Sequence, residues 1–246
     1  MTTTSHYAKP VQLAAGTSYE RQYFFDCVRA SLFKGTLTQS QVDGMNYILD
    51  SWEKYFPFKM REHLAYVLAT TYHETAQKMR PIEEYGKGAG YTYGKPSGPY
   101  NKVYYGRGHV QLTWEDNYKK ATDKIKPYGL EADLWKYPER ALEDEISVTV
   151  MFDGMGDGWF TGKKLSDYLT SSKEDPVNAR RVVNGTDKAQ TIADYYWKFK
   201  SALQPVPEEP PDVSDGPQMT DPQVATVDIT VESDAPIRLV VNGVEI

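Results

Sequence analysis

The sequence has little of what several kinds of protein need. It contains one cysteine, Cys27, so no internal disulfide can form, which fits a protein made in a reducing cytosol. Four histidines beside one cysteine are a poor supply of metal ligands. The formal net charge is -6, which does not favour a nucleic-acid partner. We therefore expect no metal, no cofactor and no nucleic acid.

Long apolar runs are also missing. No uncharged apolar stretch approaches the roughly 20 residues that cross a bilayer, so we expect no stable membrane insertion. Residues 1–10 are polar and lack the basic region and apolar run of a secretory signal. These features predict a chain made in the cytoplasm. If its substrate lies outside the cytoplasm, something else must deliver the protein to it.

The composition favours one globular main domain. A chain of 246 residues with 40% hydrophobic and 25% charged residues can bury one good-sized core. Aromatic residues make up 13% of the chain, with 19 tyrosines against 8 phenylalanines. Tyrosine combines a ring face with a hydroxyl group, which suits a cleft for a polar, faceted ligand such as a sugar. A tyrosine-rich core explains the same composition equally well.

Most of the main domain has a helical pattern. Apolar residues recur at spacings of three and four between Ser18 and Leu203, which predicts a mainly α fold. Thr38 followed by Gln41 forms a capping box at the start of one helix. The expected helices cover residues 19–32, 38–54, 59–78, 114–124, 139–155, 163–169, 175–183 and 187–202.

Composition also divides the chain. Residues 84–105 are rich in Gly, Tyr, Lys and Pro, which predicts a long functional loop with a short hairpin. The main domain is expected at 1–203, followed by a proline- and acid-rich linker at 204–223. Residues 224–246 alternate apolar and polar side chains, which predicts a small β appendage. Two or three short strands are marginal alone, so we expect this tail to dock on the main domain or to mediate self-association.

One acidic residue closes an apolar helix. No Asp, Glu, Lys or Arg occurs from Leu64 through His73, and Glu74 follows on the same side of the helix as Val67 and Thr71. A carboxyl group at the edge of an apolar surface loses solvation, which raises its pKa. A raised pKa is what a general acid needs near neutral pH. On this pattern alone, a partly exposed or salt-bridged glutamate is the commoner outcome.

A second carboxylate follows where the helix gives way to the loop. Glu83 and Glu84 are adjacent there, and either can act as a base. In an inverting glycosidase the two carboxyl groups stand about 6.5 to 9.5 Å apart, with room between them for the attacking water. The alternative is a pair of solvated loop acids without a catalytic role.

Four motifs that follow one another along the chain resemble the motifs of one protein family. Tyr72-His73-Glu74-Thr75, Tyr104-Tyr105-Gly106-Arg107-Gly108, Gln111-Leu112-Thr113-Trp114 and Asn117-Tyr118 are similar to motifs of glycoside hydrolase family 19. The resemblance covers roughly residues 55–203. It implies a lysozyme-like, two-lobed helical domain with a long active-site loop, and the family holds chitinases and phage-type lysozymes.

The resemblance assigns roles to three residues. The Glu of the His-Glu-Thr motif is the general acid in the family and corresponds to Glu74. In the bacterial branch the base falls nine positions later, which corresponds to Glu83 and leaves Glu84 as the substitute. A serine that positions the attacking water in plant members corresponds to Thr113, which keeps the hydroxyl group.

The resemblance also implies sugar contacts. Near the end of the domain, an arginine and an Asn-Gly pair close the cleft in relatives, although Asn184-Gly185 is also a good helix stop signal. The substrate-binding residues implied in this way are Tyr105, Arg107, Gln111, Asn117, Arg181 and Asn184.

Other catalytic motifs are incomplete. His73-Glu74 begins a zinc-protease motif, but Gln77 stands where the second histidine ligand belongs. The glycine-rich run at 88–96 departs from a phosphate-binding loop at two positions. No serine lies in a Gly-x-Ser-x-Gly elbow.

The sequence therefore predicts a hydrolase of the cell wall. The first hypothesis is a bacteriophage endolysin, a lysozyme-type muramidase that cuts the β-1,4 bond between N-acetylmuramic acid and N-acetylglucosamine in peptidoglycan. Such an antimicrobial enzyme would act in the periplasm during host cell lysis. The second hypothesis is a chitinase acting on N-acetylglucosamine polymers. The third is an inactive virion structural or binding module that keeps the fold.

Overall fold

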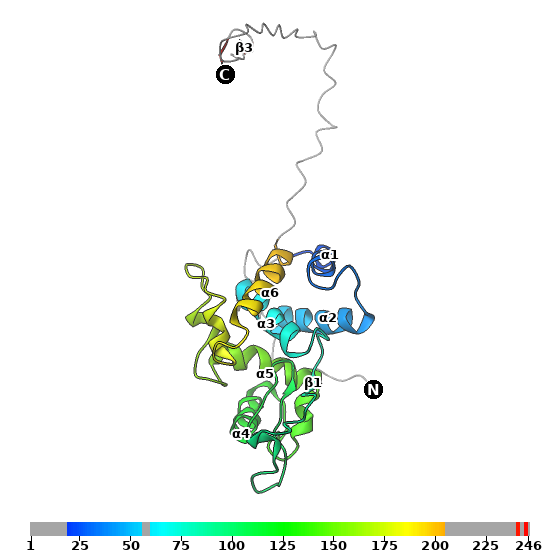
Figure 1. The fold of residues 1–246 in the computed structure, drawn as a ribbon, viewed down its shortest axis with the longest axis vertical. Helices are drawn as coiled ribbons and strands as arrows, with labels where there is room; N and C mark the ends of the chain where they lie inside the picture. The colour runs from blue at the N-terminus through cyan, green and yellow to red at the C-terminus, as the bar shows by residue number, and fades with distance from the viewer. Residues whose placement is uncertain (1–18, 56–59, 205–239, 242–243, 246) are drawn as a thin grey trace. The chain divides into compact units, whose positions relative to one another are not determined.

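The computed structural model describes residues 19–55, 60–204, 240–241 and 244–245, and the chain divides into two units at residues 1–206 and 207–246 (Figure 1). In the second unit, β3 (Val240–Val241) and β4 (Val244–Glu245) pair antiparallel, with Val241 opposite Val244. Residues 205–239, which hold nearly all of the expected linker and most of the expected β appendage, lie outside the described residues. The division into 1–203, 204–223 and 224–246 stays a prediction.

The first unit is mainly helical, as the sequence predicts. Its helices are α1 (Arg21–Ser31), α2 (Gln39–Tyr55), α3 (Arg61–Glu74), α4 (Glu115–Lys124), α5 (Asp144–Asp157) and α6 (Ala189–Ala202). The capping box predicted before α2 is present, because Thr38 N donates to Gln41 Oε1 at 2.9 Å and Gln41 N donates to Thr38 Oγ1 at 3.3 Å.

The core is built around α3. The apolar run that contains Leu64, Val67 and Leu68 is fully buried, which explains why it carries no charged side chain. Helix α6 packs on both α3 and α1, and α5 also contacts α3. In Figure 1, α4 and β1 lie on one side of α5, whereas α1, α2, α3 and α6 lie on the other.

Helix α3 ends at Glu74, four residues before the expected end at residue 78. The backbone turns left-handed at Ala76, Gln77 and Met79, with φ of 48°, 69° and 57°, so the helix cannot continue. The Thr75 hydroxyl donates to Thr71 O at 2.7 Å and accepts from Met79 N at 3.0 Å. This turn places Glu74 at the very end of α3 and brings the chain back toward a short strand.

A two-stranded sheet follows the turn. Strand β1 (Ile82–Glu83) pairs antiparallel with β2 (Arg107–Gly108), and Glu83 stands opposite Arg107. The loop between them contains a short 3-10 turn at Thr92–Gly94 and an antiparallel bridge between Ser97 and Lys102, which matches the expected hairpin. A Cβ on Gly94 would lie 1.8 Å from the carbonyl oxygen of Gly88, so the loop needs glycine there.

Three predicted helices differ in the structure. Residues 163–169 and 175–183 form only the 3-10 turns Leu165–Asp167 and Asn178–Val182, and 139–155 divides into the 3-10 turn Pro138–Leu142 and helix α5. Side chains cap the first two of these segments, whose turns then close as 3-10 turns. Asp167 accepts from Lys164 N at 2.9 Å, and Asp175 accepts from Asn178 N at 3.1 Å.

Candidate active site

One cleft collects most of the residues singled out from the sequence. Its volume is about 710 Å³. It is lined by the end of α3, the residue after β1, the segment around β2 and α4, and two loops at 160–161 and 183–185. The lining residues are Glu74, Glu84, Tyr91, Tyr93, Gly106, Val110, Gln111, Thr113, Trp114, Asn117, Phe160, Thr161, Val183, Asn184 and Gly185.

Glu74 is held at one side of this cleft by a buried arginine. Its side chain is 16% exposed, and Arg180 Nη1 donates to Glu74 Oε1 at 2.7 Å. Arg180 is only 2% exposed, and its Nε donates to the carbonyl oxygen of Asp187 at 3.0 Å. A charge-assisted bond from such a fixed guanidinium orients one carboxylate oxygen and leaves the other available. The neighbouring His73 has its pKa lowered by burial, which favours the neutral ring.

The arginine that binds Glu74 is Arg180, and not Arg181, which the resemblance implied as a substrate contact. Arg181 is exposed to solvent, and its Nε donates to Asn178 Oδ1 at 3.3 Å. The two arginines follow each other in a 3-10 turn, so their side chains leave it in different directions and only one is turned inward. Asn184 and Gly185 do line the cleft, and Gly185 also has the left-handed φ of 42° that suits a stop signal.

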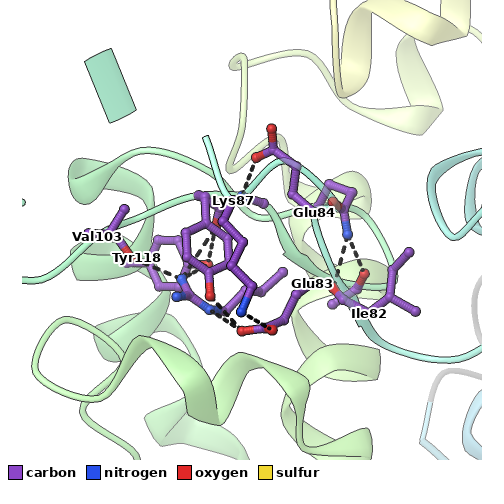
Figure 2. Close-up of polar contacts among 11 residues, drawn as sticks. Ile82, Glu83, Glu84, Lys87, Val103 and Tyr118 are labelled. Carbon is purple, nitrogen blue, oxygen red and sulfur yellow. Dashed lines mark hydrogen bonds and ion pairs between the residues drawn. The ribbon is translucent and has the colours of Figure 1, made fainter. Parts of the chain in front are cut away.

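Glu83 and Glu84 lie on opposite sides of the short sheet (Figure 2). Adjacent residues of an extended strand point to opposite faces. Glu84 lines the cleft that contains Glu74, where Gly106 N donates to Glu84 Oε2 at 3.1 Å and Tyr93 OH donates to Glu84 Oε1 at 3.2 Å. The side chain expected to face Glu74 across the cleft was that of Glu83, and the structure places Glu84 there instead.

Glu83 is already fully partnered on its own side of the sheet. Tyr105 OH donates to Glu83 Oε1 at 2.5 Å, Lys87 Nζ lies 3.2 Å from Oε2, and Arg107 Nε lies 3.8 Å from Oε1. The hydrogen bond from Tyr105, with smaller contributions from Lys87 and Arg107, lowers the pKa of Glu83. The ionised carboxylate of Glu83 therefore links β1 to residues next to and within β2, and we call this group of contacts the anchor of the sheet.

Tyr105 and Arg107 belong to that anchor and lie outside the lining of the cleft. They are 8% and 6% exposed, and the Arg107 guanidinium lies 3.6 Å from the centre of the Tyr105 ring. Arg107 Nη1 also donates to Val103 O and to Tyr118 OH, each at 3.1 Å. The structure therefore does not bring Tyr105 and Arg107 into the lining of the cleft, where they were expected to contact sugar.

Three other expected residues form a connected rim in the cleft. Gln111 has a left-handed φ of 54°, and its Nε2 donates to Ile82 O and Gly108 O, both at 3.1 Å. Thr113 Oγ1 donates to Gln111 O at 2.7 Å, and Asn117 Nδ2 donates to Thr113 O at 2.9 Å. The side-chain oxygens of Thr113 and Asn117 keep acceptor capacity for a ligand or a water.

Sequence reasoning missed several members of the site. Arg180 and the aromatic residues Tyr91, Tyr93 and Trp114 were not singled out. Period-two alternation shows that Glu83 and Glu84 must face opposite ways, but it does not show which of them faces Glu74. That choice depends on the register of β1 against β2, which no local pattern specifies.

Two negative findings apply to the described part of the chain. Among residues 19–55, 60–204 and the two short strands, no group of three or more His, Cys, Asp or Glu side chains could hold a metal ion. Within the same residues, no helix combines the length and the apolar character that a bilayer span requires.

Comparisons with known proteins name chitinases. No protein-family model matches the chain, and no curated protein matches it. Among solved structures, chitinase C from Streptomyces griseus HUT6037 is 19% identical with a TM-score of 0.43, over 77% of this chain and 94% of that one. A mutant chitinase C is 17% identical with a TM-score of 0.43, over 78% and 95%. A bacterial family 19 chitinase is 21% identical with a TM-score of 0.46, over 76% and 96%.

Proposed function

We propose that this chain is an inverting glycoside hydrolase of β-1,4-linked amino-sugar polymers, with Glu74 as general acid and Glu84 as general base. The observation that carries the proposal is the placement of two carboxyl groups from separate elements in one cleft. Glu74 ends α3 and Glu84 follows β1, so the two are held independently. Glu83, the other candidate for the base, is turned to the opposite side and occupied by three partners.

The reaction divides between these two groups. Protonated Glu74 gives its proton to the glycosidic oxygen as the bond from that oxygen to the anomeric carbon breaks. Ionised Glu84 accepts a proton from a water whose oxygen forms the new bond to the anomeric carbon from the opposite face. The products are a shortened chain with an inverted reducing end and a free hydroxyl on the leaving sugar.

The rim residues support this assignment. Thr113 is fixed by its bond to the Gln111 carbonyl, so its oxygen lies in the cleft in a defined position with lone pairs free to accept from water. Asn117, fixed by the Thr113 carbonyl, presents its amide group at the same rim. Positioned groups of this kind lower the entropy cost of bringing a water and a sugar together.

Peptidoglycan is the polymer that we propose first, and chitin is the alternative. Both consist of β-1,4-linked N-acetylhexosamines, so the acid and the base do not distinguish them. The family that the motifs resemble holds both phage-type lysozymes and chitinases, so the ranking of peptidoglycan, with a role as an endolysin that reaches the periplasm during host lysis, is our proposal and the substrate test decides it.

The test compares the two polymers directly. The purified full chain is incubated with Gram-negative sacculi and with the hexamer of N-acetylglucosamine, beside a Glu74→Gln control, and new reducing ends are identified by mass spectrometry. The proposal predicts products ending in reducing N-acetylmuramic acid, initially as the α-anomer by proton NMR. Cleavage of the hexamer alone would establish the chitinase, and no turnover of either would favour an inactive module.

A further inference from the structure

Three aromatic side chains form a continuous cluster on one wall of the cleft. The rings of Tyr91 and Tyr93 are stacked, with centroids 5.1 Å apart and an interplanar angle of 6°. Trp114 meets Tyr93 edge to face at 5.1 Å and 73°. We call Tyr91, Tyr93 and Trp114 the aromatic platform. Although the three pack on one another, Tyr91 remains 60% exposed and Trp114 51% exposed.

The platform is rigidly built. Trp114 has a left-handed φ of 76°, which is an uncommon conformation for a bulky residue and persists where the surroundings impose it. Its backbone N–H donates to Tyr104 O at 2.9 Å, and helix α4 starts at the next residue. Tyr93 is tied to the proposed base, because its hydroxyl donates to Glu84 Oε1. The backbone that carries the exposed indole is therefore fixed on both sides of Trp114.

A second hollow lies beside the platform. Its volume is about 200 Å³, and Tyr93 and Trp114 line both this hollow and the cleft that contains Glu74. Polar groups complete it, including Ser97, whose hydroxyl donates to Glu115 Oε2 at 2.6 Å, and the exposed Asp116. The second hollow and the cleft therefore share two aromatic side chains in their linings.

We propose that the aromatic platform is a sugar-binding subsite that extends the cleft beyond Glu84 and holds a further ring of a β-1,4-linked N-acetylhexosamine chain. This inference rests on the proposed function of the same cleft. A pyranose ring has a face of C–H groups, which packs on the electron-rich face of an aromatic ring, and hydroxyl groups around its edge. The platform supplies the aromatic faces, and the second hollow supplies acceptors for the hydroxyl groups.

Exposure alone does not define such a subsite. Tyr85, Tyr137 and Trp197 are also exposed, at 72%, 42% and 46%, but none of them lines the cleft or the second hollow. Tyr137 therefore provides a matched control: an exposed aromatic residue outside both hollows.

The consequence is a dependence on chain length. A polymer long enough to reach the platform gains contacts there, whereas a dimer bound at the catalytic carboxylates does not. Loss of the platform should therefore weaken binding of long chains and leave short ones nearly unchanged.

The experiment measures binding in the full-length Glu74→Gln background by titration calorimetry. The probes are the hexamer and the dimer of N-acetylglucosamine, and peptide-free glycan strands from peptidoglycan. Trp114→Ala and Tyr91→Ala should each bind the hexamer or the strands about tenfold more weakly, which corresponds to the loss of one stacked ring. Trp114→Phe, which keeps an aromatic face, should recover most of the affinity, and Tyr137→Ala should match the background.

Tryptophan fluorescence gives an independent readout. Emission should shift on addition of the hexamer, and the shift should be lost in Trp114→Phe. Equal affinity of Trp114→Ala and Tyr137→Ala for every long probe, with melting temperatures unchanged, would overturn the platform, as would no binding of any long probe. Glu74→Gln retaining full turnover would instead overturn the proposed function, which separates the two failures.

Discussion

Glu83 and Glu84 are chemically identical neighbours whose surroundings give them different roles. Glu83 contacts a tyrosine hydroxyl and two cations, so its charge is neutralised locally and its pKa is lowered. Glu84 lines the cleft with Glu74 and accepts only from a backbone N–H and the Tyr93 hydroxyl among the bonds in the described structure. A base must reach a water beside the substrate, and this geometry favours Glu84.

The buried pair of Arg180 and Glu74 gives a prediction at the residue scale. Arg180→Met should lower the free energy of unfolding by about 3 kcal/mol, because it leaves the Glu74 carboxylate without its partner in a largely buried position. Urea denaturation at neutral pH measures the change. Arg181→Met is the matched control, since its side chain is exposed, and it should stay within about 0.5 kcal/mol of the parent. Equal effects of the two substitutions would contradict the distinction between the arginines.

The two-stranded sheet of β1 and β2 gives a prediction at the scale of the element. The pKa of Glu83 is lowered in the folded chain, so its charge stabilises the fold above the ordinary carboxyl value of 4.5. This contribution disappears as the pH falls through the lowered pKa. Glu83→Gln should therefore unfold more easily than the parent at pH 7, by less than about 1 kcal/mol because the side chain is one-third exposed.

Denaturation at several pH values tests this sign. The difference between Glu83→Gln and the parent should shrink toward zero as the pH is lowered below the usual carboxyl range. Tyr105→Phe removes the largest cause of the lowered pKa and should itself reduce the dependence of stability on pH. A difference that grows in acid would show that Glu83 is not stabilised as an anion.

Helices were predictable where their pattern was local. The sequence placed α2, α4 and α6 to within two residues, because apolar spacing and the absence of proline agree in all three and the Thr38 cap marks the start of α2. The end of α3 was not, since the helical pattern gives no sign of the left-handed conformations that Ala76 and Gln77 adopt. The two 3-10 segments were predicted too long, because their capping signals are real but each segment forms only a short 3-10 turn.

The candidate site was predictable in outline. Glu74, Gln111, Thr113 and Asn117 all line one cleft, as the motifs implied. Tyr105 and Arg107 do not line it, because their side chains contact Glu83 on the other side of the sheet. A motif shows that residues belong together in space, but it does not show which of them face the ligand.

At the scale of the whole molecule, charge is unevenly distributed along the chain. Residues 207–246 hold nine acidic residues and one basic residue, whereas residues 1–206 hold 25 acidic and 27 basic ones. The net charge of -6 therefore originates from the C-terminal unit. Sacculi carry the free carboxylates of their stem peptides, so this unit repels them and the N-terminal unit does not.

Salt should reveal this repulsion. Binding of full-length Glu74→Gln to sacculi should strengthen between about 0.01 M and 0.15 M salt, because the screening length falls from about 30 Å to about 8 Å. Binding of the uncharged hexamer should not change. Replacing the nine acidic residues of 207–246 by their amides should reverse the trend on sacculi, and a salt response that is the same in both proteins would exclude the C-terminal charge as its cause.

We propose Glu74 and Glu84 as the acid and the base of one cleft. The most direct measurement is the initial rate on the preferred polymer for Glu74→Gln, Glu84→Gln and Glu83→Gln, each confirmed as folded by its melting curve. We expect the rate to fall at least about 100-fold for the first two and less than about tenfold for Glu83→Gln, since general acid and base groups each contribute about 100-fold or more. An active Glu84→Gln beside an inactive Glu83→Gln would contradict this proposal.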